Sequence, residues 1–339
     1  MSAAVEEGVT DAPAVDAVPK RAMTMGTGTS LVALAVLLIV PLVLKHFVVF
    51  QMTMLLDYAL AVLALNILTG GSGQFSLGQS AFYAIGAYTA GVLMVQFNVS
   101  YALAIPIAGG LCFIVGFLFG QPALRLSGIY LALATFALAV AMPDMLKLNF
   151  LESLTGGVQG LVIDAPTPPF GLSIGQDAWL YYLTLAITIA IYVASVNLLQ
   201  SRSGRAMMAI RDNEIAASAM GVNVALYKTL AFGISAAFTG VAGALGAIIV
   251  QYVAPDSYGF VFAIAIFLGM VVGGVGWLPG SLVGAAFMIF VPNIAESISK
   301  GLSGVIYGVL LLMIIYLVPH GARQAATACQ QVVSRFRKR

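Results

Sequence analysis

The sequence predicts an all-α, polytopic membrane protein with about ten transmembrane helices, some of them broken by Gly-rich stretches. Only 8% of its 339 residues are charged, and 61% are hydrophobic. A soluble domain carries about 25% charged residues, because its surface faces water. The apolar residues also gather in runs of roughly 20, which is the length of a helix that spans the hydrocarbon of a bilayer. A soluble fold is therefore excluded.

The expected spans are the apolar runs between polar, Gly or Pro residues. In chain order they are 29–45, 50–69, 74–97, 101–120, 124–146, 178–199, 228–252, 259–276, 279–298 and 302–319. They form one transmembrane domain over 29–320. We expect residues 1–28 to be a disordered tail, and the basic tail over 321–339 to lie beside anionic membrane lipid.

Lys and Arg residues indicate the orientation, because cytoplasmic loops carry an excess of them. With the N-terminus in the cytoplasm, 12 of the 15 basic residues fall inside, and only Lys45, Lys147 and Lys300 fall outside. An even number of spans also keeps the basic C-terminal tail inside. Both tails are therefore expected to be cytoplasmic.

Two loops are long enough to have a function of their own. The external loop, about 149–177, is rich in Gly and Pro, and the cytoplasmic loop, about 200–227, is the most polar segment between the first and last spans. In the latter, Asp212 or Asn213 can cap a short helix that has Glu214 in its first turn and ends at Gly221.

This short helix is more than a connector needs. Its small side chains with Met220 alongside suit a groove on a partner protein; the alternative is an interfacial helix that rests on lipid headgroups. The small residues are Ala216, Ala217 and Ala219.

The segment from Glu214 to Gly221 resembles the EAA loop of ABC-importer permeases, which the ATP-hydrolysing subunit grips. In that loop the two alanines usually follow Glu directly, whereas here Ile215 stands between them. The wider sequence, over about 50–322, resembles the LivM-type permease subunits of branched-chain amino-acid ABC importers, a family that also includes urea and amide importer permeases. The segments that carry this resemblance are Asn66 through Tyr88, Leu154 through Gly157, Ser203 through Gly221, Gly273 through Gly276, and Pro319 through Gly321.

The resemblance implies a permease subunit in a bacterial inner membrane. Its partners would be a second permease, forming a heterodimer, two ABC ATPase subunits on the cytoplasmic face, and an extracytoplasmic solute-binding protein. ATP and Mg would be bound by the ATPases, since this chain has no G-x-x-x-x-G-K-[ST] phosphate loop and is expected to bind no cofactor. The coupling residues would be Gly204, Arg205, Arg211, Glu214, Ala216, Ala217 and Gly221.

The solute stays open at this point. The resemblance favours branched-chain amino acids, and urea or short amides are the alternative, because selectivity would lie mainly in the binding protein. A departure from the family is Gln79, where His is frequent, so this position offers little for a proton-linked role.

Two Gly-rich breaks, Thr69–Gln74 and Gly273–Gly276, indicate broken helices. Within a membrane such backbone is tolerated only beside protein or a water-filled cavity. Each break is followed by a small-residue run that ends in Ala-Phe, which suggests an internal repeat with a substrate site between its halves. The alternative is close helix packing, as expected for Gly116 and Gly120, which are four residues apart.

Candidate residues of the translocation path are the polar groups set among these spans. Asp57 is the charged residue deepest in a span, so it should face the bundle interior or water. The others are Asn66, Gln74, Ser76 and Gln79 around the first break, and Thr155 and Gly156 in the external loop. The alternatives are a Tyr or Asn partner for Asp57 and plain interhelical hydrogen bonds for the uncharged groups.

Functions of other classes fit the sequence less well. A stand-alone secondary transporter or channel would need coupling groups in the membrane, and it would leave the helix in 200–227 without a role. An intramembrane enzyme is not indicated, because there is no His/Glu metal pair, no paired Asp and no nucleophile with a base. The net charge of +2, without a basic stripe, argues against nucleic-acid binding. We therefore assign no catalytic or metal-ligating residue.

Overall fold

The computed structural model describes residues 45–123, 128–164 and 175–298, together with a few isolated positions outside these ranges. Long helices account for most of the described chain. They are α2 (His46–Asn66), α3 (Gln79–Val95), α4 (Tyr101–Ala123), α5 (Ile129–Leu146), α7 (Gln176–Gln200), α10 (Val224–Val250), α11 (Phe260–Gly273) and α12 (Gly280–Ile298). The shorter elements are the π-helix η2 (Ile67–Gly71), α6 (Asn149–Thr155), η3 (Gly157–Gln159), β1 (Leu161–Val162), α8 (Arg202–Asp212), α9 (Glu214–Ala219), β2 (Tyr252–Val253) and η5 (Pro255–Tyr258).

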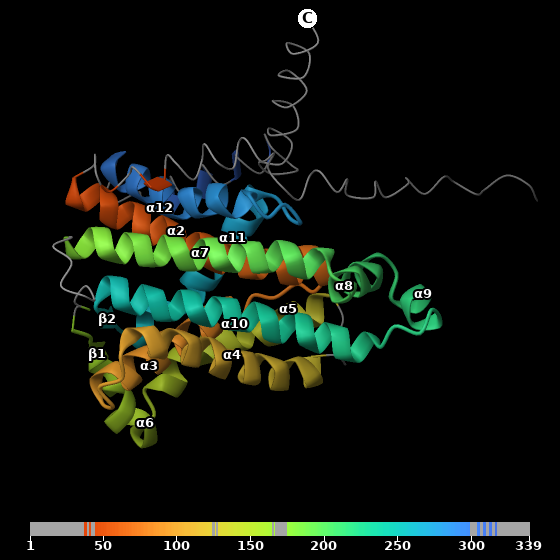
Figure 1. Cartoon of the computed structure of the whole chain (residues 1–339), viewed down its shortest axis with the longest axis horizontal. Coiled ribbons are helices and arrows are strands. Elements are labelled where there is room, and N and C mark those ends of the chain that lie inside the picture. The colour runs from red at the N-terminus through yellow and green to blue at the C-terminus, as the bar shows by residue number, and fades with distance from the viewer. Residues whose placement is uncertain are drawn as a thin grey trace, which may run out of the picture.

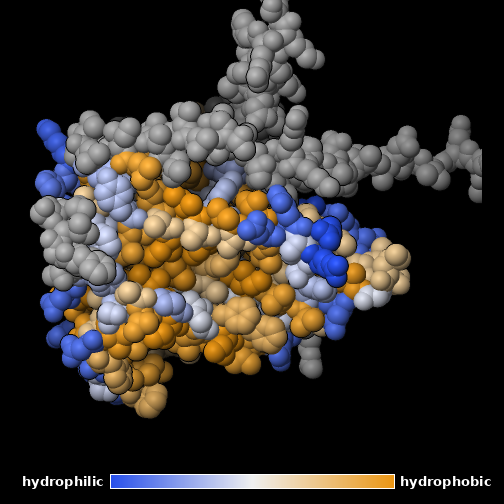
Figure 2. All heavy atoms as spheres, in the orientation of Figure 1, coloured by the Kyte–Doolittle hydropathy of each residue, from blue (hydrophilic) through white to orange (hydrophobic). Residues whose placement is uncertain are grey.

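The long helices lie side by side along one direction and form a bundle (Figure 1). Seven helical segments in the described part of the chain are long and apolar enough to cross a bilayer, and α3, with 17 residues, is at the short limit of a span. Figure 2 shows hydrophobic side chains over the flank of the bundle and hydrophilic ones at its two ends. The predicted all-α, multi-pass membrane protein is confirmed.

Eight of the ten expected spans coincide with long helices. The first and last, 29–45 and 302–319, lie outside the described residues except for single positions, as do the tails 1–28 and 321–339. The count of ten spans therefore stays a prediction.

The helix bounds differ from the prediction mainly beside the first break. We expected a span from residue 74, but α3 begins at Gln79. Gly73 has a φ of 72°, a conformation that glycine adopts readily, and it redirects the chain after η2. The described part of the loop predicted to be external has secondary structure of its own, because it contains α6 and β1, which pairs antiparallel with β2, Leu161 opposite Val253.

Helix α10 is the centre of the bundle and is buried along most of its length against α2, α3 and α4. Glycines allow this close approach: a side chain at Gly243 would collide with the backbone carbonyl of Tyr83. Gly116 and Gly120 of α4 pack in the same way against Ala236 and Thr229 of α10. The packing interpretation of this four-residue spacing is confirmed.

The two ends of the bundle gather different loops (Figure 1). The loop end carries α8, α9 and the end of α2, and the strand end carries α6, β1, β2 and η5. An ion pair of 2.5 Å between Lys147 and Asp256 joins two segments at the strand end. Among the described basic residues, Lys45 and Lys147 belong to the strand end and the others to the loop end, as the charge pattern predicted; the latter are Arg202, Arg205, Arg211 and Lys228.

Candidate functional site

The expected coupling loop folds into two helices, α8 and α9, each with a side-chain cap. Ser201 accepts a hydrogen bond of 3.2 Å from the backbone N–H of Gly204 at the start of α8. Asn213 accepts one of 3.0 Å from that of Ala216 in α9, and Gly221, with a φ of 82°, follows the helix. The predicted cap and stop of the short helix are confirmed, whereas α8 was not predicted as a separate helix.

Helix α8 is held against the bundle by its apolar face. Met207 and Ile210 are buried, and Met207 belongs to the same apolar cluster as Leu68 of η2 and Phe232 of α10. At the turn from α7, a side chain at Gly204 would collide with the carbonyl of Leu198. Helix α8 therefore rests directly on the end of α2 and on α10.

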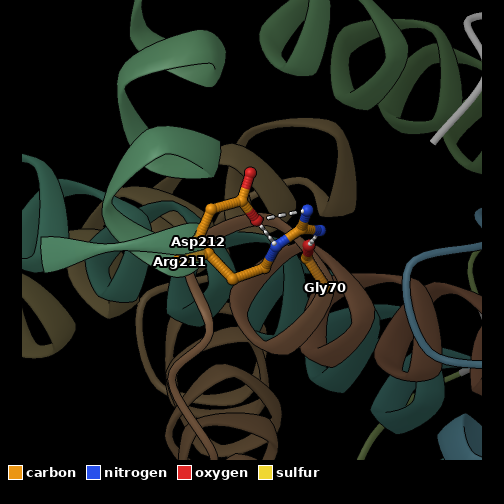
Figure 3. A network of polar contacts seen from close by, with 3 residues as sticks. All are labelled: Gly70, Arg211 and Asp212. Carbon is orange, nitrogen blue, oxygen red and sulfur yellow. Dashed lines mark hydrogen bonds and ion pairs between the residues drawn. The ribbon is translucent and has the colours of Figure 1, made fainter. Parts of the chain in front are cut away.

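Arg211 and Glu214 add polar contacts between this segment and the bundle. One guanidinium nitrogen of Arg211 donates a hydrogen bond of 2.7 Å to the carbonyl of Gly70, while Asp212 holds the other edge of the group (Figure 3). Glu214, the first residue of α9, pairs with Lys228 of α10 at 2.5 Å. In contrast, Arg205 donates to the carbonyl of Gln200 at the end of the preceding helix.

The tip of α9 leaves two large apolar side chains uncovered by this chain. Ile215 and Met220 are 82% and 85% exposed, although Ala217 between them is buried. The helix projects beyond the bundle (Figure 1), and its tip is hydrophobic beside a hydrophilic surface (Figure 2). An exposed apolar surface with a polar rim is typical of a protein interaction site.

A cavity of about 240 Å³ lies between α8, α10 and the break after α2. Its polar lining includes Gln74, whose amide nitrogen donates to the Ser72 hydroxyl at 2.9 Å and to the Lys228 carbonyl at 3.1 Å. Both Lys228 and Arg211 line the cavity beside the carboxylates of Asp212 and Glu214. Gln74 is thus a predicted path residue that borders an open space.

Asn66 joins the two Gly-rich breaks. Its amide nitrogen donates to the carbonyls of Gly274 at 3.2 Å and Trp277 at 3.1 Å, and its oxygen accepts from the N–H of Gly276 at 2.6 Å. A Cβ placed on Gly70 would lie 2.5 Å from the Cα of Gly276. The turn between α11 and α12 is therefore fastened to the end of α2, which meets the need of buried backbone for partners.

Gln79 is also used for interhelical bonding. Its amide donates to the Ser235 hydroxyl at 2.9 Å and accepts from the Thr239 hydroxyl at 2.6 Å, so it links α3 to α10. Ser76 is buried and accepts from the backbone N–H of Gly78 at 3.2 Å. The interhelical interpretation fits Asn66 and Gln79, and the role of any of these residues in a path stays a prediction.

Asp57 is fully buried among aromatic rings. Its Oδ2 accepts a hydrogen bond of 2.6 Å from the Tyr83 hydroxyl, and among the described residues its Oδ1 has no partner. Tyr83 in turn packs against Tyr258 and Phe262. Asp57 faces the bundle interior, as expected. Its partner is a tyrosine on a neighbouring helix, which is one of the two structural partners that the sequence suggested.

Thr155 and Gly156 lie at the strand end, far along the bundle from the cavity beside Gln74. The Thr155 hydroxyl donates to the carbonyl of Leu146 at 2.9 Å and closes the turn after α5. Gly156, with a φ of 71°, ends α6. The structure therefore does not gather the predicted path residues into one site.

Sequence reasoning missed the partners that hold these residues. Tyr83 gave no distinctive local signal, and the break that contains Gly276 was predicted without its contact to Asn66. Ser235 and Thr239 did, since two hydroxyl side chains four residues apart share one face of a helix, and both are buried in α10.

Comparison with known proteins gives a consistent family. A family model described as the permease component of the branched-chain amino acid transport system matches residues 47–315. The high-affinity branched-chain amino acid transport system permease protein LivM of Escherichia coli K12 is 32% identical over 311 residues, covering 84% of this chain and 72% of that protein. The Salmonella typhimurium protein of that name is 32% identical over 78% of this chain and 67% of its own length.

A more distant relative carries the name LivH instead of LivM. The probable branched-chain amino acid transport permease protein LivH of Methanocaldococcus jannaschii is 24% identical over 75% of this chain and 82% of that protein. No solved structure matches the chain significantly. Since the family model covers most of the sequence, and a relative of 32% identity covers 84% of it, the chain belongs to the branched-chain amino acid transport permease family and is a transport subunit rather than an enzyme.

Proposed function

We propose that this chain is a permease subunit of an ATP-binding-cassette importer and moves branched-chain amino acids by alternating access. The names of its relatives support the solute class. Because relatives of both the LivM and the LivH kind match, we pair the chain with a second, similar permease in a bacterial inner membrane. A solute-binding protein would deliver the solute at the strand end.

The observation that carries this proposal is the exposed apolar tip of α9. A single-chain transporter gains nothing from Ile215 and Met220 facing water, whereas a partner that covers them would bury both side chains. The basic residues at this end favour the cytoplasmic side, where ATPase subunits are found. We therefore place the ATPases on α9, with ATP and Mg bound by them.

The solute would meet uncharged polar groups of this chain beside the charged side chains that line the same cavity. Gln74 borders the cavity at the loop end, and weak binding there suits a permease whose affinity for solute is supplied by a separate binding protein. The amide of Asn66 is occupied by the α11–α12 turn and that of Gln79 by α10, so their part is to shape the path and not to bind.

Co-purification tests the assignment. Met220→Glu puts a charge on the α9 tip, and burying it against a partner is costly. We expect this variant to lose the ATPase subunits that accompany the tagged wild-type chain from membranes, with quantitative mass spectrometry as the measurement. Val158→Glu is the matched control, because Val158 is 70% exposed at the opposite end; it should retain them. Full retention in Met220→Glu would contradict the docking surface.

A further inference from the structure

Arg211 is the residue through which α8 bonds to the first helix break. Its guanidinium donates to the Gly70 carbonyl at 2.7 Å, and Asp212 fixes the orientation of the group with bonds of 3.0 and 2.9 Å. The side chain is only 25% exposed. Carbonyls at the end of a helix lack helical partners and carry partial negative charge, so a cation is favourable there.

The contact leaves little room for α8 to slide. A Cβ on Gly73 would lie 2.9 Å from the Cγ of Arg211, which shows that the side chain lies directly on the backbone after η2. On the same side, the buried Met207 of α8 packs in one cluster with Leu68 of η2. Polar and apolar contacts thus join α8 to the π-helical end of α2.

This end of α2 is in turn attached to the second break. Gly70 is in backbone contact with Gly276, and Asn66, one turn earlier, makes three hydrogen bonds to the turn between α11 and α12. A continuous series of contacts therefore runs from α8 through η2 to that turn. Single π-helical turns inside helices occur frequently at functional sites.

We propose that Arg211 is a positioning residue for energy coupling, because it transfers movement of α8–α9 to η2 and, through the Gly70–Gly276 contact, to the turn between α11 and α12. This inference rests on the proposed function, in which ATPases move α9. It adds the route inside the chain and identifies the α11–α12 turn as the element that responds.

The test needs a reporter at the far end of the route. Val275 lies in the α11–α12 turn and is exposed, so Val275→Cys can be alkylated there. Position 275 should then carry the reactive thiol, because the native Cys112 is buried and the other native cysteine, Cys329, is changed to Ser for this experiment. The rate of alkylation is measured in the complex with its co-purified ATPases, without nucleotide and with ATP plus vanadate. This readout does not depend on which solute is carried.

With wild-type Arg211, nucleotide should change the alkylation rate at position 275 by at least about fivefold, the lower range of an allosteric coupling. Arg211→Gln should reduce the change to less than about twofold. Arg202→Gln is the matched control on the same helix, because Arg202 is exposed at the start of α8, and it should respond like wild type. An undiminished response in Arg211→Gln, or none in the wild type, would overturn the inference.

Two further measurements distinguish a role of Arg211 in coupling from a role in folding, and a failure of this inference from a failure of the proposed function. Arg211→Lys keeps a cation and one donor for the Gly70 carbonyl, so it should restore part of the response. Both Arg211 variants should retain the ATPases and their basal hydrolysis; if Arg211→Gln loses them, the residue only supports the fold, and the inference fails. Absence of any co-purified ATPase from the wild type would instead refute the proposed function.

Discussion

At the scale of single residues, many polar side chains of this bundle form hydrogen bonds with backbone groups. Asn66 provides one acceptor and two donors to three backbone groups of the α11–α12 turn. This turn cannot use helical hydrogen bonds, and buried backbone groups without partners are costly. One amide side chain therefore makes a non-helical turn tolerable within an apolar bundle.

Asn66→Ala should for this reason lower the stability of the purified protein. The N–H of Gly276 would lose its partner, and the carbonyls of Gly274 and Trp277 would each lose one of two donors. We therefore expect a loss of about 2 kcal/mol. Thermal unfolding in detergent measures it. Asn197→Ala, at an exposed position of α7, is the control and should change stability by less than about 0.5 kcal/mol. Equal effects of the two substitutions would show that the Asn66 bonds contribute nothing.

At the scale of elements, glycine determines how closely helices approach α10. Gly243 of this helix lies against the Tyr83 carbonyl of α3, and a side chain at Gly246 would collide with the Tyr83 hydroxyl, which bonds to Asp57. The buried carboxylate is thus kept in place by a helix contact that requires two glycines. Packing of this kind is the main source of helix association where lipid surrounds the bundle.

Two matched Gly→Ala substitutions test this packing. Gly243→Ala should destabilise the protein by about 2–3 kcal/mol, since the backbones must separate. Gly110→Ala, in α4, meets no atom within 4 Å and should be neutral or stabilising by up to about 1 kcal/mol through its better helix propensity. Measured in one detergent, the melting temperature should fall for Gly243→Ala and stay or rise for Gly110→Ala; an equal fall in both would rule out the contact as the cause.

At the scale of the whole molecule, the sequence predicts local features well and distant contacts poorly. Apolar runs and Gly punctuation are local signals, so eight of the ten predicted spans coincide with helices, and the cap and stop of α9 were predicted correctly. The contact of Asn66 with Gly276 joins residues 210 positions apart, and the β1–β2 pair is also non-local, with Leu161 opposite Val253. Such contacts depend on how helices pack, which hydropathy does not encode.

The same limit applies to the candidate site. The predicted coupling residues form one segment because they lie close together in sequence, whereas most of the predicted path residues were chosen for polarity within spans. In the structure Gln74 borders a cavity at the loop end, while Thr155 closes a turn at the strand end. Polarity in a span therefore identifies buried bonding groups as readily as it identifies a path.

The two ends of the bundle should face opposite sides of the membrane. Ile215→Cys and Val158→Cys place exposed thiols at the loop end and the strand end. In intact cells whose outer barrier is permeabilised, an impermeant maleimide should label position 158 and not position 215. Inside-out vesicles stripped of their peripheral ATPase subunits should give the reverse pattern. Labelling of position 215 from outside would invert the topology and remove the cytoplasmic docking surface.

The most direct test of the central claim is uptake of radiolabelled leucine into proteoliposomes. The chain is reconstituted with its second permease, its ATPases and the binding protein, and compared with the same vesicles without ATPases. We predict accumulation that requires both ATP and the ATPase subunits, and none without them under any ion gradient. Leucine uptake by the permease alone, driven by a sodium or proton gradient, would contradict the account.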